Sequence, residues 1–385
     1  MSAHRKSARH VTNSGWRQFI IGVLAFPWII VVLAGVGYRL TMPGALFLLR
    51  FMDKGSEGDP LSVREVVIEQ GSRRISARVY QPMGDHDRVL VVVHGVHFGG
   101  YDEPRLVHFS KRLAGLGHAV ITPDIQDLKN YSIEVQALDD IERVTKWALD
   151  DSGLVDPSGG GRVGLLGISF AGGLCVSAAG SKDLEDRLDF VFSFGGHADL
   201  DRTMKYLVTG DLPDGGKLPP HIYGQAVILS RFAHQLVPSK DVEPLKQALN
   251  HYLREEWKTV REKAAHLSPK ARRLVMLCLE RKTEELGPIL EPLIKTEQSL
   301  SALSPVRHDP PSCPVFLLHG SVDNVIPPSE TVALERWASK STETTALVSP
   351  LITHVELGDK VRIFSPIPYY KIIRFWTELL REEAD

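Results

Sequence analysis

The sequence is poor in cysteine and carries no excess of charge of either sign. Its three cysteines, Cys175, Cys278 and Cys313, cannot form a disulfide framework, and their wide spacing excludes a zinc ribbon or a CxxC redox site. Lysine and arginine number 45 against 47 aspartates and glutamates, and the net charge of -2 argues against a dedicated nucleic-acid binder. A P-loop, a Rossmann glycine fingerprint and a His-x-x-x-His metal site are also missing, so we expect no cofactor and no metal.

Apolar residues make up 43% of the chain, and the longest uncharged run lies near the N-terminus. Residues 19–38 read FIIGVLAFPWIIVVLAGVGY. As a helix this segment is about 30 Å long, which matches the hydrocarbon core of a bilayer, so it predicts a single transmembrane helix. The basic residues before it favour a cytoplasmic N-terminus, with the rest of the chain outside the cytoplasm. They are Arg5, Lys6, Arg9 and Arg17.

Two other interpretations of residues 19–38 stay open. One is a cleaved signal peptide, for which Ala34, Gly35 and Gly37 offer small residues, although its apolar region is usually about 7–15 residues long. The other is a buried core helix, and the uninterrupted length of the run argues against it. Residues 40–52 are also apolar and could either lie in the membrane interface or pack on a folded domain.

From residue 64 onward, patterns typical of strands and helices alternate. Residues 89–94 (VLVVVH) form a continuous apolar run, which is typical of a strand buried on both faces. Strands are predicted at 64–70, 74–80, 89–94, 118–123, 162–168, 189–194, 314–318 and 344–349. Helices are predicted at 104–115, 133–150, after Ser169 and at 366–383. This order predicts an α/β protein whose mostly parallel sheet is covered by helices on both faces.

Residues 201–310 interrupt this alternation, because they contain no strand of comparable strength. Residues 241–262 place apolar side chains on one helical face, and 269–284 and 288–300 are also helical in pattern. The segment is not low in apolar residues, so it is a helical insertion rather than a linker. We therefore divide the chain into a basic tail (1–18), a transmembrane helix (19–38), a juxtamembrane linker (39–61), a first part of an α/β core (62–200), the helical insertion (201–310) and a second part of the core (311–385).

One short motif indicates a nucleophile. Residues 167–172 (GISFAG) follow an apolar strand and open a helix rich in small residues. In a nucleophile elbow, a strained turn between strand and helix exposes a serine hydroxyl above the sheet, and small neighbours allow the backbones to approach. Gly167 meets this requirement, and Ala171 replaces the usual second glycine. Ser169 is therefore the candidate nucleophile, and the alternative is a structural serine in a glycine-rich turn.

A serine hydroxyl needs a general base, which a third group holds in place. Asp323 follows a predicted strand in LLHGSVDNVIP, and His354 lies beyond the next strand in LITHVEL. The chain order is therefore serine, acid, histidine. In these motifs the sequence resembles the α/β-hydrolase fold family, particularly its esterase, lipase and dienelactone-hydrolase-like members, over residues 62–200 and 303–383.

The resemblance implies an oxyanion hole beside the nucleophile. Residues 94–97 (HGVH) directly follow a predicted strand, as the oxyanion loop of the family does, although the fuller HGGG form is absent. By this resemblance the backbone N–H groups of Val96 and Phe170 bind the developing oxyanion. The turns around these donors are shaped by His94, Gly95 and Gly167.

Other residues near predicted strand ends compete for these roles. His97 and His197 are alternatives to His354 as the base, whereas His319 is expected to be structural. Asp124 and Asp199 are alternatives to Asp323, which is favoured because its segment matches the usual acid segment of the family better.

Together these features predict a membrane-anchored serine hydrolase that cleaves carboxylic esters through a Ser169-Asp323-His354 triad and an acyl-enzyme intermediate. The resemblance places a cap at the position of the helical insertion, and the expected partners are a small-molecule acyl ester and a membrane. Neither nucleic acid nor an obligate protein partner is expected. An acyltransferase or a non-catalytic binding protein on the same fold are the alternatives, and a protease lacks any supporting motif.

Overall fold

The computed structural model describes the chain in seven pieces. They are residue 38 and residues 41–51, 60–70, 73–155, 161–297, 299–352 and 365–381. His354 and the predicted transmembrane segment, except for its last residue Tyr38, lie outside these residues.

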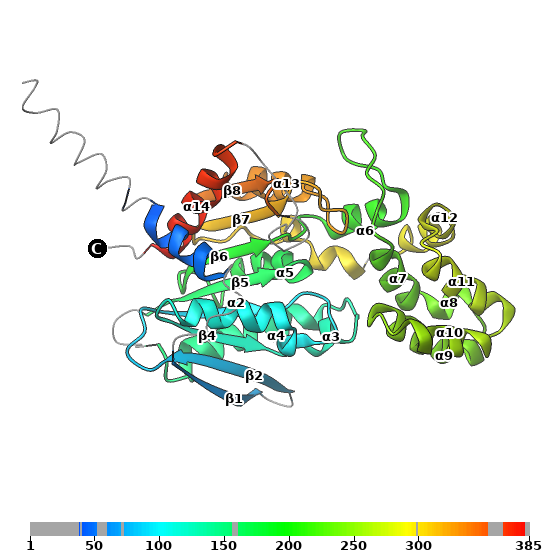
Figure 1. Ribbon diagram of the computed structural model, residues 1–385, viewed down its shortest axis with the longest axis horizontal. Helices are drawn as coiled ribbons and strands as arrows, with labels where there is room; N and C mark the ends of the chain where they lie inside the picture. The colour runs from blue at the N-terminus through cyan, green and yellow to red at the C-terminus, as the bar shows by residue number, and fades with distance from the viewer. Residues whose placement is uncertain are drawn as a thin grey trace, which may run out of the picture.

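An eight-stranded sheet forms the centre of the molecule, in the order β1-β2-β4-β3-β5-β6-β7-β8 (Figure 1). The strands are β1 (Leu61–Gln70), β2 (Arg73–Pro82), β3 (Arg88–Val93), β4 (His118–Pro123), β5 (Val163–Ile168), β6 (Leu188–Phe194), β7 (Val315–Gly320) and β8 (Thr344–Ser349). β2 pairs antiparallel with β1 and β4, and all the other pairs are parallel. The predicted mostly parallel sheet is thus confirmed.

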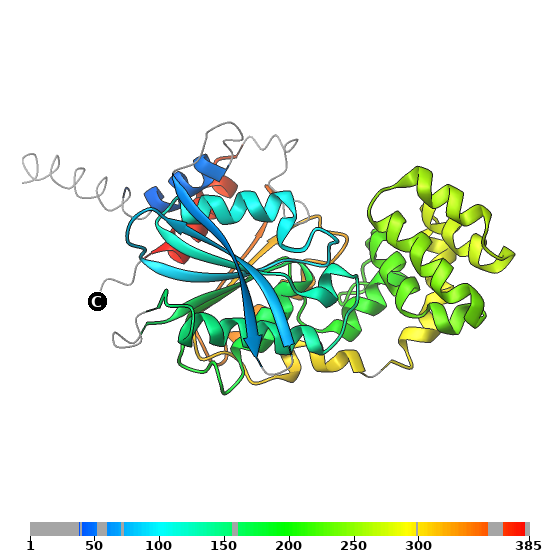
Figure 2. The same ribbon diagram turned by 90° about the horizontal axis from the view of Figure 1, so that it is seen from below.

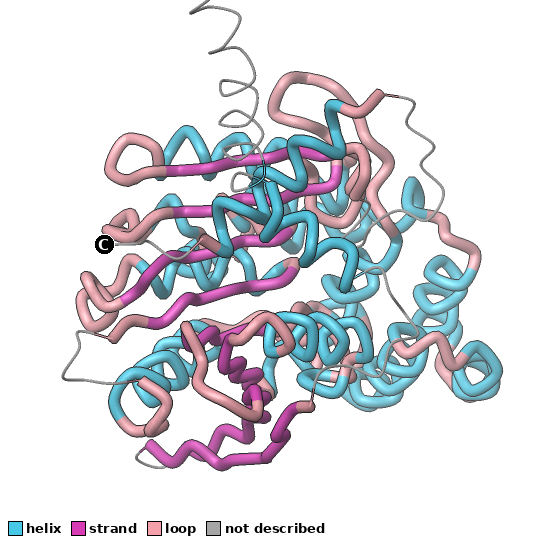
Figure 3. The backbone as a smooth tube through the Cα atoms, turned by 60° about the vertical axis from the view of Figure 1, so that its left-hand side comes forward, coloured by secondary structure: helices cyan, strands magenta, loops and turns pink. Residues whose placement is uncertain are grey.

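Helices cover both faces of this sheet, as Figure 3 shows. The helices that belong to this α/β core are α2 (Pro104–Ala114), α3 (Gln126–Lys129), α4 (Gln136–Asp150), α5 (Phe170–Ala179), α13 (Ser329–Ala338) and α14 (Ile367–Leu380). Side chains of α4, α5 and α13 join one buried apolar cluster, and those of α2 and α14 join a second cluster on the other face. The sheet therefore separates two cores.

Residues 89–93 of β3 are all apolar because their side chains alternate between the two cores. Val91 and Val93 belong to the first cluster, whereas Leu90 and Val92 belong to the second. Successive side chains of a strand point to opposite faces, so a central strand needs an apolar residue at every position. β3 therefore forms deep in the sheet, and its carboxyl end delivers the loop at residues 94–97 to one edge.

The helical insertion lies between β6 and β7 and sits beyond the carboxyl ends of the parallel strands (Figures 1 and 2). Its helices are α6 (Leu200–Thr209), α7 (Ile222–Arg231), α8 (Ala233–Leu236), α9 (Ser239–Leu253), α10 (Trp257–Ala265), α11 (Pro269–Leu279) and α12 (Thr283–Ile294). Short 3-10 helices, η3 (Ser299–Leu303) and η4 (Pro305–Arg307), lead back to the sheet, and a third, η1 (Gly100–Asp102), precedes α2.

Two predicted helices of the insertion are interrupted. The helical pattern at 241–262 is divided into α9 and α10 at Glu255, and the pattern at 269–284 is broken at Arg281. Glu255 has a φ of 59° and Arg281 a φ of 53°, a left-handed conformation in which an α-helix cannot continue. The apolar periodicity carries on across both breaks, because each following helix also buries one face.

Residues 41–51 form an N-terminal helix that packs on α14. The backbone N–H of Gly44 donates to Thr377 Oγ1 at 3.0 Å, and a Cβ at Gly44 would lie 2.0 Å from the carbonyl oxygen of Ile373. Glycine thus allows this close approach. The ring centroids of Phe47 and Trp376 are 4.3 Å apart. Among the described residues, no helix is long and apolar enough to cross a bilayer.

His118, at the start of β4, makes the fold sensitive to acid. Burial lowers its pKa from 6.5 to about 4, and the nearby Arg88 adds to the effect. The folded state therefore favours neutral His118, while the unfolded chain takes up a proton as the pH falls below 6.5. Its contribution to stability is complete above pH 6.5 and is lost as the pH falls toward 4.

Between pH 7 and pH 5, we expect the free energy of unfolding of the wild type to fall by about 2 kcal/mol more than that of His118→Gln. Urea unfolding at both pH values measures this difference. His266→Gln, at an exposed histidine after α10, is the matched control and should keep the wild-type slope. Equal slopes for wild type and His118→Gln would contradict the assignment.

Candidate active site

Ser169 occupies a strained turn between β5 and α5. Its φ is 56° and its ψ is -130°, a combination that side chains with a Cβ rarely adopt. Two backbone hydrogen bonds hold the turn. Ser169 N–H donates to the carbonyl oxygen of Phe194 at the end of β6, at 2.6 Å, and Gly172 N–H donates to the carbonyl oxygen of Ser169 at 2.8 Å. Both geometry and position are those of a nucleophile elbow.

Small residues around Ser169 make this turn possible. A Cβ at Gly167 would lie 2.2 Å from the carbonyl oxygen of Ala171, so the strand and the helix touch backbone to backbone. A Cβ at Gly95 would lie 3.1 Å from both the Ser169 Cβ and the Ile168 carbonyl oxygen. Gly167 therefore permits the turn, and Gly95 lets residues 94–97, the candidate oxyanion loop (called the oxyanion loop below), pass close to Ser169.

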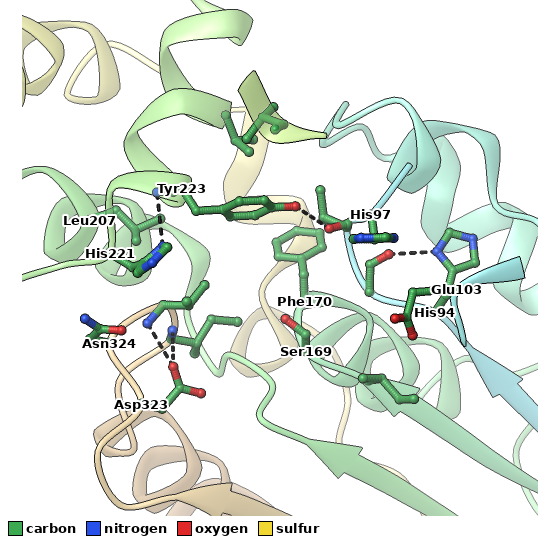
Figure 4. A pocket seen from close by; sticks show the side chains of 18 of the residues that line it. His94, His97, Glu103, Ser169, Phe170, Leu207, His221, Tyr223, Asp323 and Asn324 are labelled. Atoms are coloured by element: carbon green, nitrogen blue, oxygen red, sulfur yellow. Dashed lines mark hydrogen bonds between the residues drawn. The ribbon is translucent and has the colours of Figure 1, made fainter. Parts of the chain in front are cut away.

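Ser169 faces a cavity of about 890 Å³ between the sheet and the insertion (Figure 4). The candidate site residues that line this cavity are His94, Gly95, Val96, Ser169, Phe170 and Asp323. Gly167 lies behind the turn and is not part of the lining. The fold thus brings together side chains from loops that follow β3, β5 and β7.

Asp323 is held rigidly beyond β7. It is 1% exposed, and its Oδ1 accepts hydrogen bonds from the N–H groups of Val325 at 2.8 Å and Ile326 at 3.1 Å. These bonds occupy one carboxylate oxygen and fix the plane of the group. A carboxylate that accepts backbone N–H bonds is stabilised in its charged form, as the acid of a triad must be.

His319 supports Asp323 from inside the protein. Its Nε2 lies 2.8 Å from the carbonyl oxygen of Ile326 and 3.3 Å from Asp323 Oδ2. A nitrogen that faces two acceptors carries a proton, so His319 donates toward the acid. It is fully buried and does not line the cavity, which excludes it as the base and agrees with the structural role expected for it.

His94 anchors the oxyanion loop. Its Nε2 accepts the N–H of Ile125 at 3.0 Å, so its Nδ1 carries the proton and donates to the carbonyl oxygen of Gly95 at 2.7 Å. Burial lowers the pKa of His94, which keeps this single-proton form. Because carbonyl and N–H of one trans peptide point in opposite directions, this bond also fixes the direction of the Val96 N–H.

Phe170 is the first residue of α5, so its N–H is among the first four that lack an intrahelical acceptor. Its ring stacks on His197, with centroids 4.7 Å apart. His197 Nε2 lies 3.0 Å from the carbonyl oxygen of Leu303, and His197 does not line the cavity. His197, an alternative base, therefore packs against the turn at Ser169.

The remaining alternatives have other partners. His97 lines the cavity, and its Nδ1 accepts the N–H of Gly99 at 3.1 Å; burial lowers the pKa of His97. Asp199 caps α6 by accepting the N–H of Arg202 at 3.1 Å, and Asp124 pairs with Lys129 Nζ at 2.7 Å. Neither acid lines the cavity. Of the three candidate acids, only Asp323 shares it with Ser169.

The walls of the cavity are mostly apolar and come from three parts of the chain. Phe109 and Ile168 belong to the core, whereas Leu207, Val227 and Ile228 belong to the insertion. Phe51, at the end of the N-terminal helix, lines the cavity as well. Its carbonyl oxygen accepts a bond from His108 Nε2 at 2.9 Å. No group of three or more metal-ligating side chains gathers anywhere in the described residues.

Sequence comparison finds no match: no family model and no curated protein matches the chain. Among solved structures it is similar to the acylaminoacyl peptidase of Pyrococcus horikoshii, with 13% identity and a TM-score of 0.48 over 83% of this chain and 41% of that one. The chain thus spans less than half of the peptidase.

Two esterases are also similar to the chain. The esterase of Pyrobaculum calidifontis shows 15% identity and a TM-score of 0.44 over 90% of this chain and 89% of that one. The esterase of Pyrococcus furiosus shows 12% identity and a TM-score of 0.46 over 83% and 91%. All three TM-scores lie below 0.5.

The strain at Ser169 predicts an unusual mutational pattern. Ser169→Gly removes the Cβ that disfavours this conformation, whereas Ser169→Ala removes only the hydroxyl and keeps the Cβ. We expect Ser169→Gly to be more stable than Ser169→Ala by about 1 kcal/mol, despite the greater freedom of glycine in the unfolded chain. Chemical unfolding of the two variants measures this, and a more stable alanine variant would show that the turn is not strained.

Proposed function

We propose that the protein is a serine hydrolase that cleaves carboxylic esters. One observation carries this proposal: Ser169 is held in a strained turn and faces the same cavity as Asp323 and the backbone of Val96 and Phe170. A buried acid, an exposed hydroxyl and two backbone donors are the parts that acyl transfer requires. The base is proposed from the sequence as His354, which lies outside the described residues.

In this mechanism Ser169 Oγ attacks the acyl carbonyl carbon, and His354 takes the hydroxyl proton. The carbonyl oxygen becomes an oxyanion, which the N–H groups of Val96 and Phe170 stabilise. The bond to the alcohol then breaks, and His354 gives its proton to the departing oxygen. Water repeats the sequence on the acyl-enzyme and releases the carboxylic acid, while Asp323 stabilises the charged imidazole throughout.

The size and lining of the cavity favour apolar esters larger than acetates. A volume of about 890 Å³ lies near the upper end of pockets that bind drug-sized ligands. Besides Asp323, the acidic residue of the core in the lining is Glu103, and it is paired with Arg105 Nε at 2.6 Å and with the N–H of Leu106 at 2.9 Å. The apolar walls can therefore bind methylene groups, each of which contributes about 0.8 kcal/mol when buried.

We expect the purified protein to hydrolyse p-nitrophenyl octanoate with a kcat/KM at least tenfold higher than that for the acetate, because six more methylene groups enter the apolar cavity. Ser169→Ala should lose at least a thousandfold in kcat. Ser177→Ala, at a buried serine of α5 that does not line the cavity, is the matched control and should retain activity.

Release of free octanoic acid in water, without an added acceptor, distinguishes hydrolysis from acyl transfer. The proposal is wrong if wild type and Ser169→Ala release p-nitrophenol at the same rate from every ester.

We further propose that residues 19–38 anchor the enzyme in a membrane, with the catalytic part outside the cytoplasm. The N-terminal helix follows this segment closely, and Met42, Leu46 and Leu49 lie exposed on one side of it. Exposed apolar residues at helical spacing next to a membrane span suit the bilayer interface, whereas Phe47 on the other side packs into the protein.

The full-length chain should sediment with membranes, resist high-salt washing and be released by detergent. Ile29→Asp with Val32→Asp should move it to the supernatant, because each charge at the centre of a span costs about 3 kcal/mol. Val63→Asp with Val67→Asp, on the exposed face of β1, adds the same charge and is the control. Sedimentation of both double variants would exclude this anchor.

A further inference from the structure

The oxyanion loop has a second support, which comes from the helical insertion rather than from the core. Tyr223, the second residue of α7, points its hydroxyl across the cavity to the carbonyl oxygen of Val96, at 2.5 Å (Figure 4). We propose that Tyr223 is a positioning residue that holds the oxyanion loop in its active geometry, an inference that rests on the proposed hydrolase function.

The two supports hold adjacent peptide groups. His94 fixes the Gly95–Val96 peptide, because its Nδ1 donates to the Gly95 carbonyl oxygen. Tyr223 fixes the next peptide, because its hydroxyl donates to the Val96 carbonyl oxygen. Each peptide is planar, so the backbone can only turn at the Cα of Val96. With both planes held, the Val96 N–H keeps one direction, and without Tyr223 only one plane remains fixed.

Tyr223 is itself placed firmly. The N–H of Tyr223 donates to His221 Nδ1, which caps the start of α7. Its ring meets the ring of Tyr131 edge to face, with centroids 6.2 Å apart. Burial raises the pKa of Tyr223 well above its usual value, so the hydroxyl stays a donor over the whole working range of an enzyme.

A second hydrogen bond between the two parts has its donor in the core and its acceptor in the insertion. Tyr131, which belongs to the core, donates its hydroxyl to the carbonyl oxygen of Leu253 at the end of α9, at 3.2 Å. Arg254 then lies over the ring of Phe98, which follows the oxyanion loop, at 5.5 Å. Insertion residues therefore contact this part of the chain at Val96 and at Phe98, and the Tyr223 hydroxyl bonds to the backbone of the loop.

The test compares Tyr223→Phe with Tyr80→Phe. Tyr80 lies in β2, is fully buried and does not line the cavity. Both variants remove one buried tyrosine hydroxyl, so a general effect on packing should be similar in the two. Only Tyr223→Phe frees the oxyanion loop.

We expect Tyr223→Phe to lower kcat for p-nitrophenyl octanoate about tenfold with KM within twofold of wild type, because the oxyanion forms only in the transition state. A trifluoromethyl ketone, which forms a tetrahedral adduct with a serine hydrolase, should bind about tenfold more weakly. Tyr80→Phe should match wild type in both measurements, and thermal unfolding shows whether both variants are folded.

The proposal is overturned if folded Tyr223→Phe matches Tyr80→Phe in kcat. It is also overturned if only the KM of Tyr223→Phe changes, because the hydroxyl would then act on substrate binding alone. The rate of labelling by a fluorophosphonate gives a readout that does not depend on the choice of ester. A wild type that neither reacts with this probe nor hydrolyses esters contradicts the proposed function itself. A wild type that reacts, together with an unchanged Tyr223→Phe, contradicts the positioning role alone.

Discussion

The backbone of Ser169 can keep a positive φ only because the surrounding structure leaves no room for any other path. Only Ser169 separates the end of β5 from the start of α5, and Gly167 lets the first turn of that helix lie directly on the strand. The same crowding brings Gly95 so close that a Cβ on it would lie 3.1 Å from the Ser169 Cβ. The turn at Ser169 and the loop after β3 are therefore packed against each other.

Residues of both the α/β core and the helical insertion form the candidate site. The core supplies Ser169, Asp323 and one support for the oxyanion loop, whereas Tyr223 and a part of the apolar wall come from residues 201–310. A hydroxyl that crosses the cavity links the two parts at the place where charge develops in the proposed reaction. A movement of α7 away from the sheet would therefore break this bond and release the Val96 carbonyl oxygen.

The parts of the fold that follow from periodicity could be predicted from the sequence. Each predicted strand is present, and Ser169 lies at the strand-to-helix turn that its motif indicates. Single residues in a left-handed conformation, such as Glu255, could not be predicted, because only glycine and asparagine signal it in advance. The role of Tyr223 could not be assigned either, and for His319 a structural role could be expected but not its contact with Asp323. A tyrosine or histidine in an apolar segment carries no local signal, and its role depends on what the fold places opposite its polar atom.

The hydrogen bond between Gly44 and Thr377 joins residues that are 333 positions apart in the chain. At synthesis rates of about 5–20 residues per second, Phe47 waits roughly 15–65 s for the helix that covers it. During that interval the N-terminal helix can pack on α2, where Phe109 lies 6.1 Å from Phe47, but the side of it that contacts α14 has no native partner. Synthesis of α14 therefore completes the apolar cluster around Phe47.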